Sequence, residues 1–86
     1  MLYYICNNNS YSLDEEYKHY FEKCSDILEN IPDTWKQYPH NNVGAVNIIN
    51  MEYNEFKKTN SIKDMEHELV YLASACIFAL KCINKD

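Results

Sequence analysis

The sequence predicts an all-α protein, a helical bundle of three main amphipathic helices that is completed by oligomerisation. The 86-residue chain contains one Gly and two Pro, whereas a β-sandwich or barrel would need many tight turns. Apolar residues recur at helical spacing in three long stretches, at about 13–31, 43–58 and 62–83. The first and third stretches each follow a Ser with an acidic residue three positions later, which is the pattern of a capping box.

A chain of this length has room for a single helical domain, 1–86, with an N-terminal arm at 1–11 and a connector at 32–42. Within the arm, Leu2–Cys6 fits either an edge strand or an extended segment. The connector holds both prolines, and we expect its Trp35 to pack over the helices.

Local signals define where the helices begin and end. Ser12 is the expected N-cap of the first helix, and Pro32 follows its end. Either Asn41 or Asn42 can cap the second helix, and Ser61 is the expected N-cap of the third. Because only residues 59–61 separate the second and third helices, we expect these helices to be antiparallel neighbours.

The third helix is apolar on nearly every side from Leu69 to Leu80. Such a helix has to be covered on every side, and two other helices with a connector barely suffice. Its small residues would permit close helix approach. We therefore expect a homo-oligomer with this helix at its centre. The small residues are Ala73, Ser74, Ala75 and Ala79.

Charge and composition exclude several classes of protein. The net charge is −5 and Arg is absent, so binding to nucleic acid is not expected. The apolar run 69–80 is shorter than the roughly 20 residues that span a bilayer, and the N-terminus lacks the basic region of a signal peptide. The four cysteines lack zinc-ligand spacing and indicate reduced core thiols. We expect a cytoplasmic protein. The bias towards Asn and Lys suggests an AT-rich genome, such as that of a low-GC bacterium or its phage; for a phage protein the location is the host cytoplasm.

Two carboxylates are the first candidates for chemistry. Glu52 and Glu55 are three residues apart and share one face of the second helix, and the antiparallel third helix can add Glu66 or Glu68. Carboxylates at such spacing can hold Mg²⁺, which is often bound by one or two carboxylates together with substrate phosphates. The alternative is that the two carboxylates simply belong to a solvent-exposed acidic face of the helix, where the same spacing is common.

The order of these features resembles the MazG-like all-α nucleotide pyrophosphohydrolases, particularly their short phage-borne branch. The resemblance spans residues 40–83 and rests on Met51-Glu52-Tyr53-Asn54-Glu55-Phe56 and on the segment that begins His67-Glu68-Leu69. It implies a helical oligomer that holds Mg²⁺ and cleaves nucleoside triphosphates to monophosphate and pyrophosphate. The metal ligands that it implies are Glu52, Glu55 and Glu68.

Two positions depart from the family pattern. Met51 stands where the first motif usually has another Glu, and Tyr71 stands where the second motif usually has Asp. We therefore expect a nucleotide-binding protein without fast turnover, which could sequester a nucleotide signal as a phage counter-defence factor. One alternative is an active Mg²⁺-dependent pyrophosphohydrolase. Another is an acidic, non-enzymatic inhibitor that binds a host defence protein.

The candidate ligand-binding residues are aromatic or cationic. Tyrosine rings can stack on bases, although core or interface packing is the commoner use of tyrosine. Lysine is the only side chain left to attract phosphates in a chain without Arg. His67 lies between two acidic residues, and a surface or oligomer contact is the alternative role there. The candidates are Tyr17, Tyr20, Tyr53, Lys57 and His67.

Overall fold

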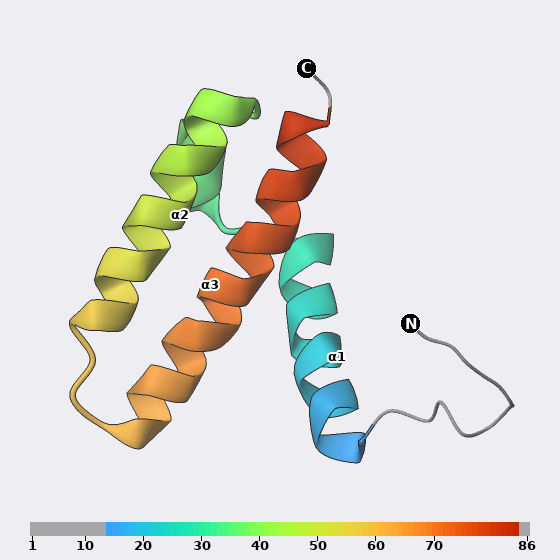
Figure 1. Ribbon diagram of the computed structural model, residues 1–86, viewed down its shortest axis with the longest axis vertical. Helices are drawn as coiled ribbons and strands as arrows, with labels where there is room; N and C mark the ends of the chain where they lie inside the picture. The colour runs from blue at the N-terminus through green and yellow to red at the C-terminus, as the bar shows by residue number, and fades with distance from the viewer. Residues whose placement is uncertain (1–13, 85–86) are drawn as a thin grey trace, which may run out of the picture.

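The chain forms three α-helices and a short 3₁₀ helix in a computed structural model that describes residues 14–84 (Figure 1). The all-α prediction is confirmed for these residues, which contain no strand. The predicted helix bounds agree with the observed ones to within two residues at every end. The arm predicted at 1–11 lies outside the described residues. The elements are α1 (Glu15–Glu29), η2 (Asp33–Gln37), α2 (Asn42–Lys57) and α3 (Ile62–Ile83).

The N-caps of α2 and α3 follow the sequence signals. Asn41 Oδ1 accepts a hydrogen bond from the backbone N–H of Gly44 at 3.0 Å. Ser61 Oγ accepts one from the backbone N–H of Asp64 at 3.1 Å. Each bond satisfies one of the first amides of its helix, which have no partner within the helix. The short linker before Ser61 makes α2 and α3 antiparallel neighbours, as predicted (Figure 1).

The start of α1 corrects the prediction of Ser12 as N-cap. The helix begins at Glu15, and its N-cap is Asp14, whose Oδ1 accepts from the N–H of Glu16 at 2.8 Å. Ser12 itself lies outside the described residues. An Asp cap brings a negative charge to the positive end of the helix dipole in addition to the hydrogen bond.

The three helices form a flat layer with α3 in the middle, between α1 and α2 (Figure 1). The extents are 44 × 38 × 20 Å, so the short dimension leaves little depth for a central core. The connector carries η2 behind α2 and α3 in this view. None of the helices within residues 14–84 has the length and apolarity needed to cross a membrane.

Trp35 is the centre of the main core. Its side chain is 0% exposed and packs with Ile48 of α2 and Ala75 of α3, and its ring centroid lies 5.2 Å from that of Phe78. An aromatic side chain of this size is a large share of the apolar surface that a small chain can bury. The expectation that Trp35 packs over the helices is confirmed.

The small residues of α3 differ in whether they are buried or exposed. Ala75, Ala79 and Ser74 are buried, and Ala79 packs with Ala45 of α2 in a second cluster. This is the close approach that the sequence indicates. Ala73, in contrast, is exposed.

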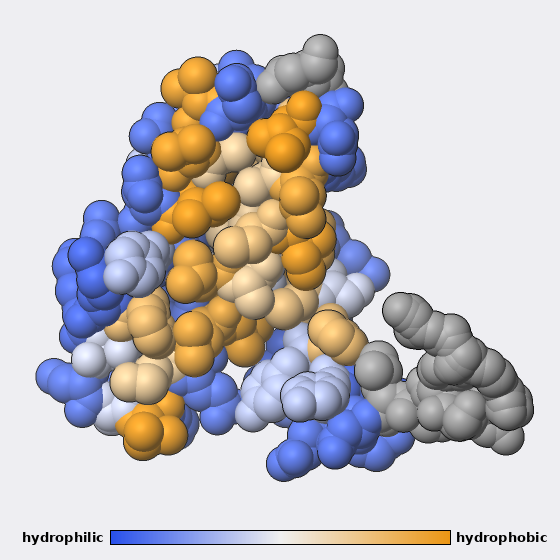
Figure 2. Space-filling view, viewed as in Figure 1, coloured by the Kyte–Doolittle hydropathy of each residue, from blue (hydrophilic) through white to orange (hydrophobic). Residues whose placement is uncertain are grey.

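One side of α3 is not covered by any other part of residues 14–84. Leu80 is 58% exposed and Ile62 is 78% exposed, and Leu69 and Ile83 are also exposed. Figure 2 shows apolar side chains gathered over α2 and α3 on the face away from η2. Within the described residues, α1 and α2 thus flank α3, the connector lies against its back, and its front is open.

Gly44 marks the closest approach of the connector to α2. A Cβ at this position would lie 1.6 Å from the carbonyl oxygen of Pro39. That oxygen belongs to the backbone, so it cannot move aside as the end of a flexible side chain could. The absence of a side chain at residue 44 therefore lets the chain turn tightly from the connector into α2.

We predict that Gly44→Ala destabilises the protein, although Ala is favoured over Gly by about 1 kcal/mol inside a helix. The new Cβ forces the connector away from α2 and loosens the packing of Trp35. Chemical denaturation followed by Trp fluorescence measures the change. Asn47→Ala, at an exposed position of the same helix, is the matched control and is expected to be neutral or stabilising. A Gly44→Ala variant as stable as that control would contradict the prediction.

Candidate functional site

The predicted metal ligand Glu52 is part of the core. Its side chain lies on the buried side of α2 and is 6% exposed. Its Oε2 atom accepts a hydrogen bond of 2.8 Å from the indole N–H of Trp35. Burial raises the pKa of Glu52, the hydrogen bond from Trp35 opposes this, and the charges of Glu68 and Glu55 raise it further. This carboxylate therefore has a structural partner and acidic neighbours.

The other two predicted metal ligands lie in different surroundings. Glu68 of α3 is half-buried and close enough to Glu52 to influence its pKa. Glu55 is exposed and forms an ion pair of 3.5 Å with Lys58. Among residues 14–84, no three His, Cys, Asp or Glu side chains are grouped so that they could hold a metal ion. Mg²⁺ binding at these three carboxylates stays a prediction.

The predicted ligand-binding residues fall in separate places. Tyr53 and Lys57 lie together on α2, with the Lys57 ammonium 4.7 Å from the centre of the Tyr53 ring. Tyr17 and Tyr20 lie on α1 and are both exposed. His67 lies on α3, with its ring 5.0 Å from that of Tyr71. These five residues therefore do not form one pocket.

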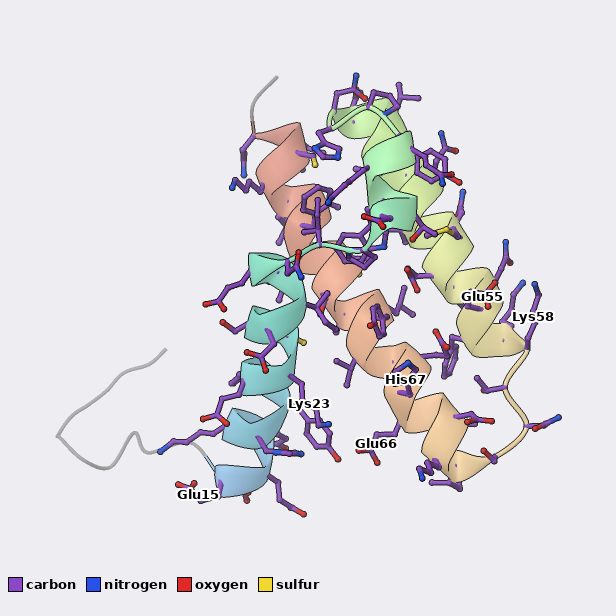
Figure 3. All side chains as sticks on the ribbon, turned by 180° about the vertical axis from the view of Figure 1, so that it is seen from behind. Glu15, Lys23, Glu55, Lys58, Glu66 and His67 are labelled. Atoms are coloured by element: carbon purple, nitrogen blue, oxygen red, sulfur yellow. The ribbon has the colours of Figure 1, made fainter. Side chains whose placement is uncertain are left out.

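A polar groove between α1 and α3 contains His67. Its volume is about 540 Å³, within the range of ligand pockets. Figure 3 shows Lys23 of α1 across from Glu66 and His67 of α3, whereas Glu55 and Lys58 lie on the far side of α2. The lining residues from α1 are Lys23, Asp26 and Ile27, and those from α3 are Lys63, Glu66, His67, Val70 and Tyr71.

The groove combines three kinds of side chain. Lys23 and Lys63 can attract an anion, Asp26 and Glu66 can accept hydrogen bonds, and Tyr71 offers an aromatic ring. Sequence reasoning missed Lys23, Lys63 and Asp26. Lys63 and His67 are four residues apart, a spacing that indicates one helix face, but the facing residues of α1 depend on how the helices pack.

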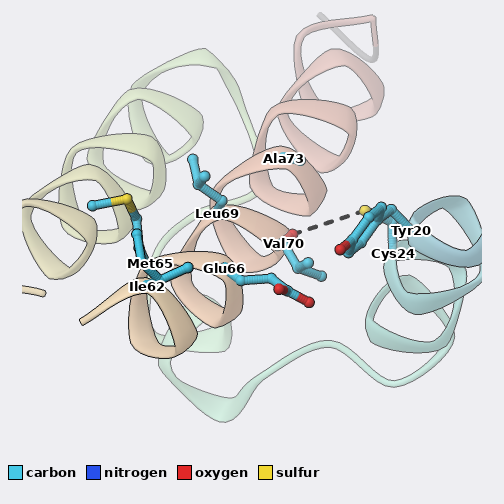
Figure 4. Close-up of a pocket in the computed structure, with 8 residues that line it drawn as sticks. All are labelled: Tyr20, Cys24, Ile62, Met65, Glu66, Leu69, Val70 and Ala73. Carbon is cyan, nitrogen blue, oxygen red and sulfur yellow. Dashed lines mark hydrogen bonds between the residues drawn. The ribbon is translucent and has the colours of Figure 1, made fainter. Parts of the chain in front are cut away.

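A second pocket lies between the same two helices and is almost entirely apolar (Figure 4). Its volume is about 390 Å³, and Cys24, Leu69 and Ala73 are among the residues that line it. Its polar groups belong to Tyr20 and Glu66. The Tyr20 hydroxyl donates a hydrogen bond to the Glu66 carboxylate, and this bond, together with the negative charge of Glu66, raises the pKa of Tyr20. This pocket fits an apolar group, not a phosphate.

Comparison of the chain with protein family models, with curated proteins and with solved structures found no match. The resemblance to MazG-like pyrophosphohydrolases therefore rests on the motifs of the sequence alone. What the structure adds is the geometry of the polar groove and the buried position of Glu52.

We predict that Glu52→Ala destabilises the fold by about 1–3 kcal/mol, because it leaves the buried indole N–H of Trp35 without its acceptor. Glu55→Ala, at an exposed carboxylate of the same helix, is the control and should change stability by less than about 0.5 kcal/mol. Urea denaturation at pH 7 measures both. Equal effects of the two substitutions would contradict a structural role for Glu52.

Glu52→Gln should give a pH-dependent result. It keeps an acceptor for Trp35 and removes the charge that burial disfavours. Since the pKa of Glu52 is raised from its ordinary 4.5 in the folded state, the wild type loses stability from this group as the pH rises from 4.5 through the folded pKa. We expect the stability of the variant relative to wild type to increase over that range and to level off above it. A relative stability that falls as the pH rises would contradict this.

Proposed function

We propose that this protein binds a nucleotide in the polar groove between α1 and α3 and does not turn it over rapidly. The observation that carries the proposal is the meeting of Lys23 from α1 with Lys63 and His67 from α3 around one groove of about 540 Å³. A groove of this size accommodates a nucleotide-sized ligand. His67 is also one of the ligand-binding residues that the sequence indicates.

Each type of side chain in the groove has a matching group on a nucleotide. The ammonium groups of Lys23 and Lys63 can pair with phosphate oxygens. The carboxylates of Asp26 and Glu66 can accept hydrogen bonds from ribose hydroxyls or base amino groups. The ring of Tyr71 can stack on a base. A simple inorganic anion would use only the cations and would meet repulsion from the carboxylates.

The positions of the carboxylates support the proposal of slow or absent turnover. Glu52 already accepts a hydrogen bond from Trp35, and Tyr71 stands where the resembled family has a further acidic residue. Mg²⁺ can still bind to the protein together with the ligand, coordinated by the phosphates of the ligand. Binding without hydrolysis suits a protein that sequesters a nucleotide signal, and we propose this role in a host cytoplasm for a phage counter-defence protein.

A Mg²⁺-dependent pyrophosphohydrolase is the second candidate. The observation that favours it is that Glu68 and Glu55 both lie close enough to Glu52 to raise its pKa. In this alternative, Glu52, Glu55 and Glu68 would hold Mg²⁺, and Glu52 would have to give up its hydrogen bond with Trp35. Turnover that Glu52→Gln abolishes while the fold remains intact would favour this candidate over the first.

We further propose that the working unit is a homo-oligomer. The open front of α3 carries Leu69, Leu80 and Ile83, which are large apolar side chains left exposed in the protomer. A second copy of the chain supplies matching apolar surface, and closed symmetric homo-oligomers are the commonest assemblies.

We predict that a nucleotide raises the melting temperature of the protein and that Lys63→Ala weakens binding about tenfold or more, since a charge-assisted hydrogen bond contributes about 1.5–3 kcal/mol. A panel of linear and cyclic nucleotides, with and without Mg²⁺, is tested by thermal shift and calorimetry while product formation is followed. Lys58→Ala, an exposed lysine outside the groove, is the matched control. Absence of binding across the panel, or equal losses in both variants, would contradict the proposal.

A further inference from the structure

The exposed residues of α3 follow a heptad pattern. They recur at alternating intervals of four and three residues along one side of the helix, which is the spacing of a coiled-coil contact. We refer to this row as the α3 seam. Its apolar members are Ile62, Leu69, Ala73, Cys76, Leu80 and Ile83, all exposed.

Most surface helices of a monomer do not present such a row to solvent. The core of this protein uses other positions of α3, among them Ala75, Ala79 and Cys82. The residues at heptad spacing lie outside these two clusters; Ile62, Leu69 and Ala73 also line the apolar pocket beside α1, whereas Cys76, Leu80 and Ile83 are exposed beyond that pocket. Exposed apolar residues of α2 also recur at helical spacing, at Val46 and Tyr53, and Figure 2 shows apolar surface over both helices. The two helices together form one broad apolar face.

We propose that the α3 seams of two copies pack against each other in antiparallel orientation, with α2 of each copy flanking the contact. The charges of α3 favour this orientation. Its first turns carry Asp64, Glu66 and Glu68 against one cation, Lys63, and are therefore net acidic, whereas its last described turn carries Lys81. Antiparallel packing brings the acidic end of one helix to the basic end of the other, and it also aligns the helix dipoles favourably. Parallel packing brings two acidic ends together.

The pairing has a definite register. Glu66 extends the seam towards its acidic end and is exposed. With a twofold axis near residue 73, Glu66 of one copy lies opposite Leu80 of the partner and next to its Lys81, and the two ends of the seam, Ile62 and Ile83, also face each other. The residue at the axis is Ala73, whose small side chain permits close approach of the two helices.

The size of the face fits a stable dimer. A helix of 22 residues is about 33 Å long, and two adjacent helices are about 20 Å wide. Their face therefore covers on the order of 660 Å², comparable with the roughly 800 Å² that each partner contributes to a standard interface. The proposal rests on the self-association proposed above and adds the surface, the orientation and the register.

Disulfide trapping tests the register. In a Cys6→Ser, Cys24→Ser, Cys76→Ser background, which also removes the thiol that shares a pocket with residue 73, Ala73→Cys places a thiol beside the twofold axis, where mild oxidation should link two chains. The matched controls keep Ala73 and either retain Cys76 or carry Glu22→Cys on the exposed surface of α1. Antiparallel packing separates the two Cys76 positions by about 9 Å along the axis, which is too far for a disulfide. We expect covalent dimer from the Ala73→Cys protein and at most traces from the controls.

Light scattering on the reduced proteins separates the two ways in which the proposal can fail. A monomeric mass at high concentration would overturn both the self-association and the interface, and would leave the face to a different partner. An oligomeric mass without disulfide at Ala73→Cys would overturn the interface alone. Efficient linkage through Cys76 would overturn the antiparallel orientation. Leu80→Glu, which places a charge in the seam, should reduce the mass to that of a monomer while helicity by circular dichroism is unchanged.

Discussion

The central constraint on this protein is that α3 is apolar on nearly every side from Leu69 to Leu80, while residues 14–84 cover only part of it. α1 and α2 lie on its two sides, and the connector with Trp35 covers its back. The front is open in the described part of the chain, because the layer of three helices at 14–84 has no further element to place there. A small domain buries a limited share of its surface, so packing between copies is a direct way to complete the core.

The hydrogen bond between Trp35 and Glu52 links this architecture to the candidate chemistry. Trp35 can be completely buried because its indole N–H has an acceptor, and Glu52 can be buried because it has a donor. The same bond occupies a carboxylate that the motifs assign to a metal. The polar groove is on the other side of α3 from α2, so a ligand there needs no change in the Trp35 pair. The proposed nucleotide binding would therefore leave this core pair in place, whereas metal-dependent hydrolysis through Glu52 would have to disturb the core.

Features encoded within a few residues were predictable from the sequence. The cap at Ser61 and the apolar spacing of the three helices are local, and the structure confirms them. The burial of Glu52 was not predictable, because it depends on Trp35, which lies 17 residues earlier and reaches α2 through the connector. The groove was missed for the same reason: Lys23 and Lys63 meet only after α1 has packed against α3. The apolar character of α3 was apparent from the sequence, but only the structure shows which of its apolar residues face outward, in the α3 seam, and which face the core.

The most direct test of the whole account is hydrogen–deuterium exchange along α3 at several protein concentrations. If the front of α3 is covered by another copy, protection of residues 69–83 should increase with concentration, while that of α1 changes little. Protection of that segment that does not depend on concentration, in a protein that stays folded, would contradict the claim that the core is completed between chains.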